Sequence, residues 1–174
     1  MKLVVAITGA SGVELGLKFI EYLPQNIEVH LITSDNASTV NRFENRSITL
    51  HDNSNIAASI ASGSFQVDAT AIIPCSMNTV AKIACGISDN LVTRTASVAI
   101  KEQKKLLLAP RELPFSAIAL ENMQKLAKLH VIIAPPILGY YSKASSIDDM
   151  ERFIIGKWYD ALGINNELYE RWKG

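Results

Sequence analysis

Short apolar runs with little polar alternation recur along the chain. They read KLVVAIT, EVHLIT, ATAIIP, KKLLLAP and HVIIAP, at residues 2–8, 28–33, 69–74, 104–110 and 130–135. Continuously apolar, β-branched runs of this length are typical of strands that are covered on both faces of a parallel sheet. The pattern therefore predicts five parallel strands, one for each run.

Apolar residues at helical spacing fill the segments between these runs. Leu15, Phe19 and Leu23 recur at every fourth residue, and similar patterns follow Ser116 and Ser146, which are of a type that favours the start of a helix. Alternating strands and helices imply right-handed crossovers. The predicted fold is therefore α/β, a Rossmann-like three-layer sandwich with an open parallel sheet. Ligands on such sheets bind beyond the carboxyl ends of the strands.

The length of 174 residues and the hydrophobic content of 48% suit one domain with a sizeable core. We therefore expect a single domain over residues 1–174. The segment at residues 44–65, ENRSITLHDNSNIAASIASGSF, is polar and rich in Ser and Asn. We expect it to form an ordered functional loop.

The charge balance and the cysteine content limit the classes of partner. The chain has 17 Lys plus Arg and 17 Asp plus Glu, so no net field attracts nucleic acid or an anionic membrane. The N-terminal apolar run breaks at Thr8 and is too short to span a membrane, and no signal cleavage site follows, which favours a cytoplasmic protein. Cys75, Cys85 and the histidines have no metal-ligand spacing, so we predict reduced thiols and no metal site. Cys75 stands at a predicted helix start without a nearby histidine, which favours packing over a nucleophilic role.

Small and hydroxyl-bearing residues follow three of the predicted strands. They are GASG at residues 9–12, Ser34, and CSMNT at residues 75–79. Hydroxyl groups and helix N-termini that meet at one sheet edge favour a phosphate site. A tight turn with Ser11 as the helix N-cap is the alternative. A dinucleotide is disfavoured, because Thr33 and Ser34 stand where an acidic residue would bind a ribose.

Several of these motifs occur together in one known family. ITGASG, ASGSF, PPILGYY and the block IPCSMNTVAKIACGISDNLVTRTASVAIKEQKKLLLAPRELPFSAIALENMQKLA resemble the UbiX-type flavin prenyltransferases, relatives of the flavin-dependent cysteine decarboxylases. The resemblance spans nearly the whole chain. It implies a metal-independent enzyme that joins the dimethylallyl group of dimethylallyl phosphate to N5 and C6 of reduced FMN. It also implies that the prenylated FMN serves a UbiD-type decarboxylase, and that the chain forms a homo-oligomer, commonly a dodecamer, with sites where subunits meet.

The same resemblance implies roles for individual residues. The positions that match flavin-binding residues are Gly9, Ala10, Ser11, Ser34, Ser76, Met77, Asn78, Thr79 and Arg111. The positions that match catalytic residues are Ser11, Glu44, Lys101 and Glu112. Among these, Glu112 is the candidate general base, because alkylation of an aromatic carbon requires the removal of its proton.

The resemblance further implies a site for the donor phosphate. The matching positions are Arg94, Lys101, Tyr141 and Lys157, and residues 164–174 resemble a C-terminal lid that carries Trp172. Many relatives have arginine where this chain has Lys157. Lysine keeps the positive charge but loses the bidentate geometry of a guanidinium group.

Other interpretations remain open from the residues alone. Arg94 and Lys101 also suit the solvated face of an amphipathic helix. A flavin-dependent cysteine decarboxylase is expected to have a histidine after the first strand, where GVELGLKF has none. A non-catalytic FMN-binding or storage subunit would not need Arg94, Lys101, Glu112 and Tyr141 together.

Overall fold

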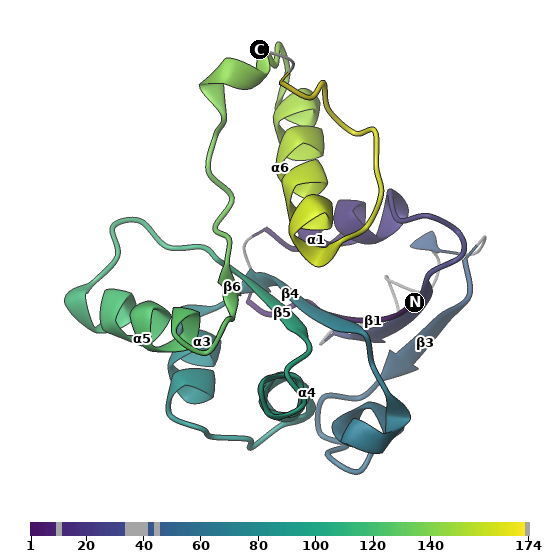
Figure 1. Ribbon diagram of the computed structural model, residues 1–174, viewed down its shortest axis with the longest axis vertical. Helices are drawn as coiled ribbons and strands as arrows, with labels where there is room; N and C mark the ends of the chain where they lie inside the picture. The colour runs from purple at the N-terminus through teal and green to yellow at the C-terminus, as the bar shows by residue number, and fades with distance from the viewer. Residues whose placement is uncertain (10–11, 34–41, 44–45, 173–174) are drawn as a thin grey trace.

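The computed structural model describes residues 1–9, 12–33, 42–43 and 46–172. Its centre is a six-stranded sheet with the order β3-β2-β1-β4-β5-β6, in which every neighbouring pair is parallel (Figure 1). The strands are β1 (Lys2–Ala6), β2 (Glu28–Ile32), β3 (Ile48–His51), β4 (Ala69–Cys75), β5 (Lys105–Pro110) and β6 (Ile132–Ile133). The predicted Rossmann-like α/β fold is confirmed.

Helices cover both faces of the sheet (Figure 1). On one face α1 (Val13–Glu21) and α6 (Ile147–Leu162) pack in a core that includes Leu3 and Val5 of β1. On the other face α3 (Met77–Ala84), α4 (Leu91–Lys101) and α5 (Ala117–Ala127) pack in a core that includes Val4 and Ala6. Successive residues of β1 thus enter opposite cores, which explains why the run has no polar alternation.

The predicted loop at residues 44–65 is wrong in part, because it contains a strand. Strand β3 pairs in parallel with β2, with Ile48 opposite Val29 and His51 opposite Ile32. It is four residues long and lies at the edge of the sheet, so its apolar signal in the sequence is too short to recognise. Further along, the segment forms the short 3₁₀ helices η1 (Ser59–Ala61) and η2 (Gly63–Phe65).

Two helices begin at the serine residues that the sequence predicted as their caps. Ser116 Oγ accepts a hydrogen bond from the Ala119 amide at 3.1 Å, and Ser146 forms a capping box with Asp149 at the start of α6. Ser11, the alternative cap in the sequence, lies outside the described residues. The N-cap of α1 is Gly12, which has a φ of 91° and makes no side-chain cap.

Gly16 allows α1 to pack closely on β4. A Cβ atom at this position would lie 2.3 Å from the carbonyl oxygen of Ile73, part of the backbone of β4. Gly16→Ala should therefore lower the free energy of unfolding by about 1–3 kcal/mol, the usual cost of overpacking. Urea unfolding measures the change.

Gly63→Ala is the matched control for this prediction. Its Cβ atom would meet the carboxylate end of Glu102, a side chain that is 39% exposed and can move aside. The control should change the free energy of unfolding by less than about 0.5 kcal/mol. Equal unfolding midpoints for the two variants would show that α1 tolerates a methyl group against β4.

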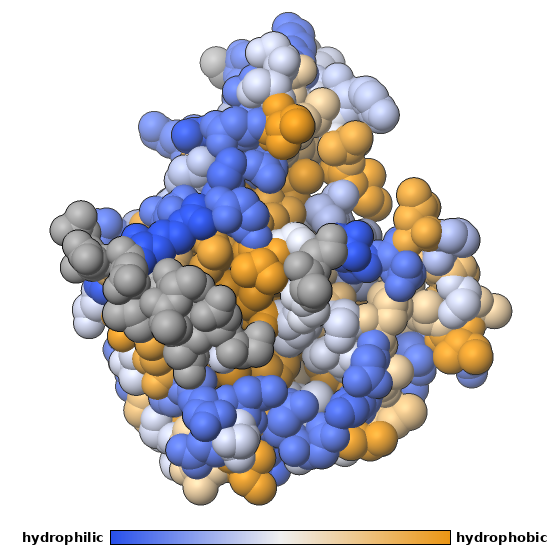
Figure 2. Space-filling model, turned by 180° about the vertical axis from the view of Figure 1, so that it is seen from behind, coloured by the Kyte–Doolittle hydropathy of each residue, from blue (hydrophilic) through white to orange (hydrophobic). Residues whose placement is uncertain are grey.

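Exposed apolar side chains gather on the side of the molecule formed by α5 and the segment that follows β6 (Figure 2). Leu113 is 92% exposed and Ile118 is 72% exposed, although Ile118 belongs to the apolar pattern of α5. Leu120, Ile137 and Leu138 are also exposed. Several exposed apolar side chains on one side of a molecule are typical of a protein–protein interface.

Candidate active site

The strand order reverses between β1 and β4, so the helices that follow these two strands cover opposite faces of the sheet. Open parallel sheets bind their ligands in the crevice at the carboxyl ends of the strands at this reversal. Thr8 and Ser76 meet here. Thr8 Oγ1 donates to the carbonyl oxygen of Pro74 at 3.0 Å and accepts from the Ser76 amide at 3.0 Å. The end of β1 is thus tied to the end of β4.

The N-terminus of α3 opens at this crevice. Ser76 Oγ caps the helix by accepting from the Thr79 amide at 3.2 Å, and it lies 2.9 Å from Thr79 Oγ1. The amides of Met77 and Asn78 belong to the first turn, where no helical carbonyl can accept from them. These donors and the helix dipole favour an anion.

Glycine backbone lines the opposite side of the crevice. Gly9 and Gly12 have φ values of 86° and 91°, a conformation that glycine adopts with little strain. A Cβ atom at Gly9 would lie 3.7 Å from Ser76 Cβ, and one at Gly12 would lie 3.5 Å from Arg111 Cδ. The starts of α1 and α3 and the Arg111 side chain therefore lie together. Small residues, helix N-termini and one guanidinium group fit the phosphate of FMN.

Glu112 follows Arg111 beyond the end of β5, at the same edge of the sheet. Its carboxylate is exposed, and Oε1 accepts from the Leu113 amide at 3.3 Å. The structure thus brings together the described flavin positions of the sequence prediction with the candidate base. The predicted residues Ala10, Ser11, Ser34 and Glu44 lie outside the described residues.

A second hollow, of about 450 Å³, lies between α6, the 3₁₀ helix η3 (Tyr140–Ser142) and the C-terminal tail. We call it the tail cavity. It contains Tyr141, Lys157 and Trp172, which the sequence analysis assigned to the donor. Lys157 makes no ion pair within the described part of the chain. The other residues that line the tail cavity are Ser142, Lys143, Tyr169, Glu170 and Arg171.

The groups of the tail cavity suit a phosphate that carries a short apolar chain. Lys143 and Lys157 supply positive charge, and Tyr141 and Trp172 supply aromatic surface. Ser142 Oγ is buried and has no hydrogen-bond partner among the described residues. Buried hydroxyl groups usually have a partner, so this one is an exception within the described part of the chain.

Two ionisable groups at the edge of the tail cavity have shifted pKa values. Burial, with the hydrogen bond to Asp160, raises the pKa of Tyr169 to about 12. Burial of Asp160 opposes its ionisation, but hydrogen bonds from Arg171 and Tyr169 outweigh this effect and lower the pKa of its carboxyl group. At neutral pH Tyr169 is therefore a neutral donor, and Asp160 is a charged acceptor.

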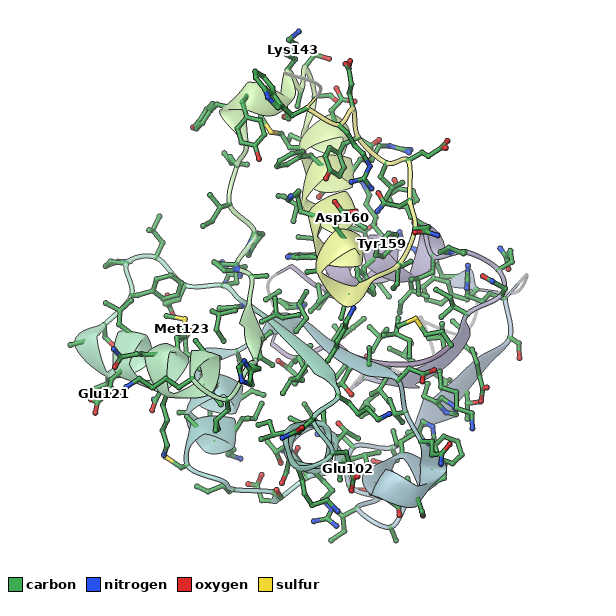
Figure 3. The ribbon with its side chains drawn as sticks, in the orientation of Figure 1. Glu102, Glu121, Met123, Lys143, Tyr159 and Asp160 are labelled. Carbon is green, nitrogen blue, oxygen red and sulfur yellow. The ribbon has the colours of Figure 1, made fainter. Side chains whose placement is uncertain are left out.

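The other two predicted donor cations, Arg94 and Lys101, lie elsewhere in this copy of the chain. Both are exposed on α4, which covers the sheet face opposite α6. Arg94 Nε donates to the carbonyl oxygen of Ala61 at 3.2 Å, and Lys101 Nζ lies 2.8 Å from Glu102 Oε1. Figure 3 shows Glu102 at the far end of the molecule from Lys143, which lines the tail cavity. One copy of the chain does not join these cations to Lys157.

The sequence did not reveal Thr8 at the crevice or five residues of the tail cavity, which are Ser142, Lys143, Tyr169, Glu170 and Arg171. Thr8 could have been found, because its hydroxyl group directly follows the first apolar run. The five cavity residues have no local signal, since they meet only when the tail folds back to η3.

Cys75 is fully buried in the core, and burial raises the pKa of its thiol, so the packing interpretation is confirmed. Cys85 is exposed, and both thiols are free.

The described residues contain no group of three or more His, Cys, Asp or Glu side chains that could hold a metal ion. None of the described helices is long and apolar enough to cross a bilayer.

Comparisons with known proteins show the family of the chain. A family model described as Flavoprotein matches residues 1–158. The chain is 48% identical to Flavin prenyltransferase UbiX of Helicobacter pylori (strain J99), over 99% of this chain and 98% of the relative. It is 37% identical, with a TM-score of 0.91, to a dodecameric FMN-dependent UbiX-like decarboxylase from Escherichia coli O157:H7, over 100% of both chains. AnUbiX (PadA1) in complex with FMN and dimethylallyl pyrophosphate is also 37% identical, with a TM-score of 0.91, over 99% of this chain and 97% of that one.

Proposed function

The chain belongs to the flavoprotein family and, within it, to the UbiX flavin prenyltransferases, and we propose that it joins the dimethylallyl group of dimethylallyl phosphate to N5 and C6 of reduced FMN. The observation that carries the proposal is the pair of anion sites: a phosphate cradle at the reversal of the sheet and a second, cationic cavity beside α6. Flavin and donor each bring one phosphate. The product is prenylated FMN.

In this proposal the cradle holds and orients the flavin. The amides at the start of α3 and the hydroxyl groups of Ser76 and Thr79 bind the phosphate and nearby polar atoms, and Arg111 adds a fixed charge. Reduced FMN supplies the nucleophilic atoms of the reaction. When the second bond forms, the flavin carbon adds to the double bond of the dimethylallyl group, and the other carbon of that double bond takes up a proton. Glu112, at the same edge, accepts the proton that leaves the flavin carbon.

The tail cavity binds the donor phosphate in this proposal. The allylic C–O bond breaks with its electron pair on the phosphate, so cations must be in place as that charge develops. Lys157 and Tyr141 supply a charge and a hydroxyl group. Trp172 covers the apolar group and keeps water from the allylic carbon.

We propose that Arg94 and Lys101 complete the donor site from a neighbouring copy of the chain. Three observations support this: both side chains are exposed on α4, Lys157 lies on the other face of the sheet, and an apolar surface remains uncovered around α5. The relative from Escherichia coli is a dodecamer. The proposed assembly of this chain is a homo-oligomer of that size.

The proposal includes the fate of the product and its place in the cell. We assign prenylated FMN to a UbiD-type decarboxylase, which would take it up as cofactor. We assign the reaction to the cytoplasm, where reduced flavin and free thiols persist. A cysteine decarboxylase and an FMN storage subunit are not favoured, because the curated relatives are flavin prenyltransferases.

Anaerobic incubation with reduced FMN and dimethylallyl phosphate tests the function. Mass analysis of the released flavin should show the gain of one dimethylallyl unit, and a reaction without donor should return FMN unchanged. A storage subunit would bind FMN and leave its mass unchanged in both reactions. That outcome, with folded and flavin-loaded protein, would contradict prenyl transfer.

A further inference from the structure

The C-terminal tail runs back along α6 toward η3 (Figure 1). Ile164 begins this return, is 4% exposed, and donates its amide to the Tyr159 carbonyl oxygen at 2.8 Å. Asn166 Nδ2 then donates to Asp160 Oδ1 at 3.0 Å and to the Gly156 carbonyl oxygen at 3.3 Å. The tail therefore follows one face of α6 over two turns of the helix.

Asp160 is the point at which the tail is held most strongly. Its Oδ2 accepts from the Tyr169 hydroxyl group at 2.5 Å, and its two oxygens accept from the two terminal nitrogens of Arg171 at 2.8 and 3.2 Å. A paired fork of this kind is the strongest arrangement between a guanidinium and a carboxylate group. The side chain of Asp160 is 24% exposed and that of Arg171 is 56% exposed, so water screens the pair in part. Figure 3 shows Asp160 on α6 at the side that the tail follows.

The ring of Tyr169 supplies the apolar part of this attachment. It packs edge-on against Phe153 at 5.2 Å, and Phe153 in turn packs edge-on against Tyr141 at 5.4 Å. The fit at α6 requires glycine, because a Cβ atom at Gly156 would lie 2.5 Å from Tyr169 Cδ1. The aromatic series links the tail to Tyr141, a residue of the tail cavity.

The ion pair between Arg171 and Asp160 also affects whether the charge of Lys157 is available to a ligand. Lys157 and Asp160 are three residues apart on α6, a spacing at which a lysine and an aspartate can pair. Arg171 forms an ion pair with Asp160 instead, and Lys157 Nζ lies 5.9 Å from the centre of the Tyr169 ring. Lys157 thus keeps its charge in the cavity without a carboxylate partner in the described chain.

We propose that Asp160, Tyr169 and Arg171 are positioning residues of the donor site. They attach the tail to α6, which places Trp172 over the cavity, and Arg171 occupies the Asp160 carboxylate, which leaves Lys157 available for the donor phosphate. The inference rests on the proposed function. It adds a cause for the position of Trp172 and for the availability of the Lys157 charge.

The first test measures attachment of the tail in the absence of substrates. Tyr169→Phe removes the hydroxyl donor, and Asp160→Asn removes the charge that Arg171 binds. Both variants should show at least about tenfold faster hydrogen exchange of the backbone amides of residues 166–172, because the tail opens more often. Asp89→Asn is the matched control, since Asp89, which lies between α3 and α4, forms a partly exposed ion pair with Lys82 of α3. Its tail should exchange as in the wild type.

The second test measures protection of the reaction from water. When the tail opens, water can attack the allylic carbon after the C–O bond breaks, which yields dimethylallyl alcohol, phosphate and a proton. The ratio of this alcohol to prenylated FMN should rise several-fold in Tyr169→Phe and Asp160→Asn and stay unchanged in Asp89→Asn. A purely structural role would lower the amount of folded enzyme but leave the ratio constant.

The third test separates charge from attachment. In Arg171→Gln the Asp160 carboxylate is free to pair with Lys157, so the KM for dimethylallyl phosphate should rise by about tenfold while the affinity for FMN stays constant. Adding Asp160→Asn to this variant removes the competing carboxylate and should lower that KM again. A double variant as weak as Arg171→Gln, or weaker, would refute the charge argument.

These outcomes are distinct from the outcome for the proposed function. Wild-type protein that forms no prenylated FMN would contradict the function, whereas tail exchange is measured without any substrate. Active enzyme with unchanged tail exchange and unchanged product ratio in Tyr169→Phe and Asp160→Asn would overturn the role of these residues alone.

Discussion

Glu112→Gln should bind FMN as tightly as the wild type and form the cyclised prenyl adduct about 10²–10⁴-fold more slowly, the usual loss when a general base is removed. Glutamine keeps the size of the side chain and its hydrogen-bonding oxygen, which accepts from the Leu113 amide in the structure. It cannot accept the proton that leaves the flavin carbon. Single-turnover mass analysis of the flavin measures the rate.

The exposure of Glu112 makes this variant a clean test. Because the side chain is exposed in this structure, its replacement should leave the free energy of unfolding nearly unchanged. Glu121→Gln, at an exposed position of α5, is the matched control and should keep full activity. Wild-type turnover in Glu112→Gln would remove Glu112 from the mechanism.

Lys101→Ala should lower prenylation by at least about tenfold, because truncating one partner of a desolvated charge pair costs about 2–5 kcal/mol and each decade in rate requires about 1.4 kcal/mol. FMN affinity should hardly change, since the proposed flavin cradle lies at the ends of β1, β4 and β5. Donor saturation curves measure the effect. Lys104→Ala, at an exposed position three residues away, should behave as the wild type.

The resemblance stated above implies an arginine at position 157, where this chain has lysine. Lys157→Arg introduces a guanidinium group at that position and should leave activity equal or raised. Unchanged donor kinetics in Lys101→Ala would show that this cation is not part of the site, and simple flavin binding would then be the better description.

Mixed oligomers test whether the two lysines come from different copies. Lys101→Ala and Lys157→Ala chains should each be weakly active, but co-assembled in equal amounts they should regain roughly a quarter of the wild-type activity. The gain arises because some sites then receive an intact lysine from each copy. No gain on co-assembly would place both lysines in the same copy at every site.

The sequence alone determined the strands and the loops that follow them. Four of the five recognised strands are continuous apolar runs because both of their faces are buried, as Val4 and Val5 of β1 illustrate, whereas β6 at the edge of the sheet is half-buried. Ser76, Ser116 and Ser146 cap helices through bonds to residues three positions along the chain. Such signals span only a few residues, so a single segment contains them in full.

The tertiary structure alone decided the features that depend on distant segments. Strand β3 is an edge strand of four residues, whose pairing with β2 cannot be read from its own weak pattern. Gly12, the N-cap of α1, lies beside Pro74 and Arg111, which come from distant parts of the chain. The attachment of Tyr169 and Arg171 to Asp160 depends on a chain that reverses after α6. In each case the energy comes from contacts between residues far apart in sequence, which no local period of hydrophobic and polar residues encodes.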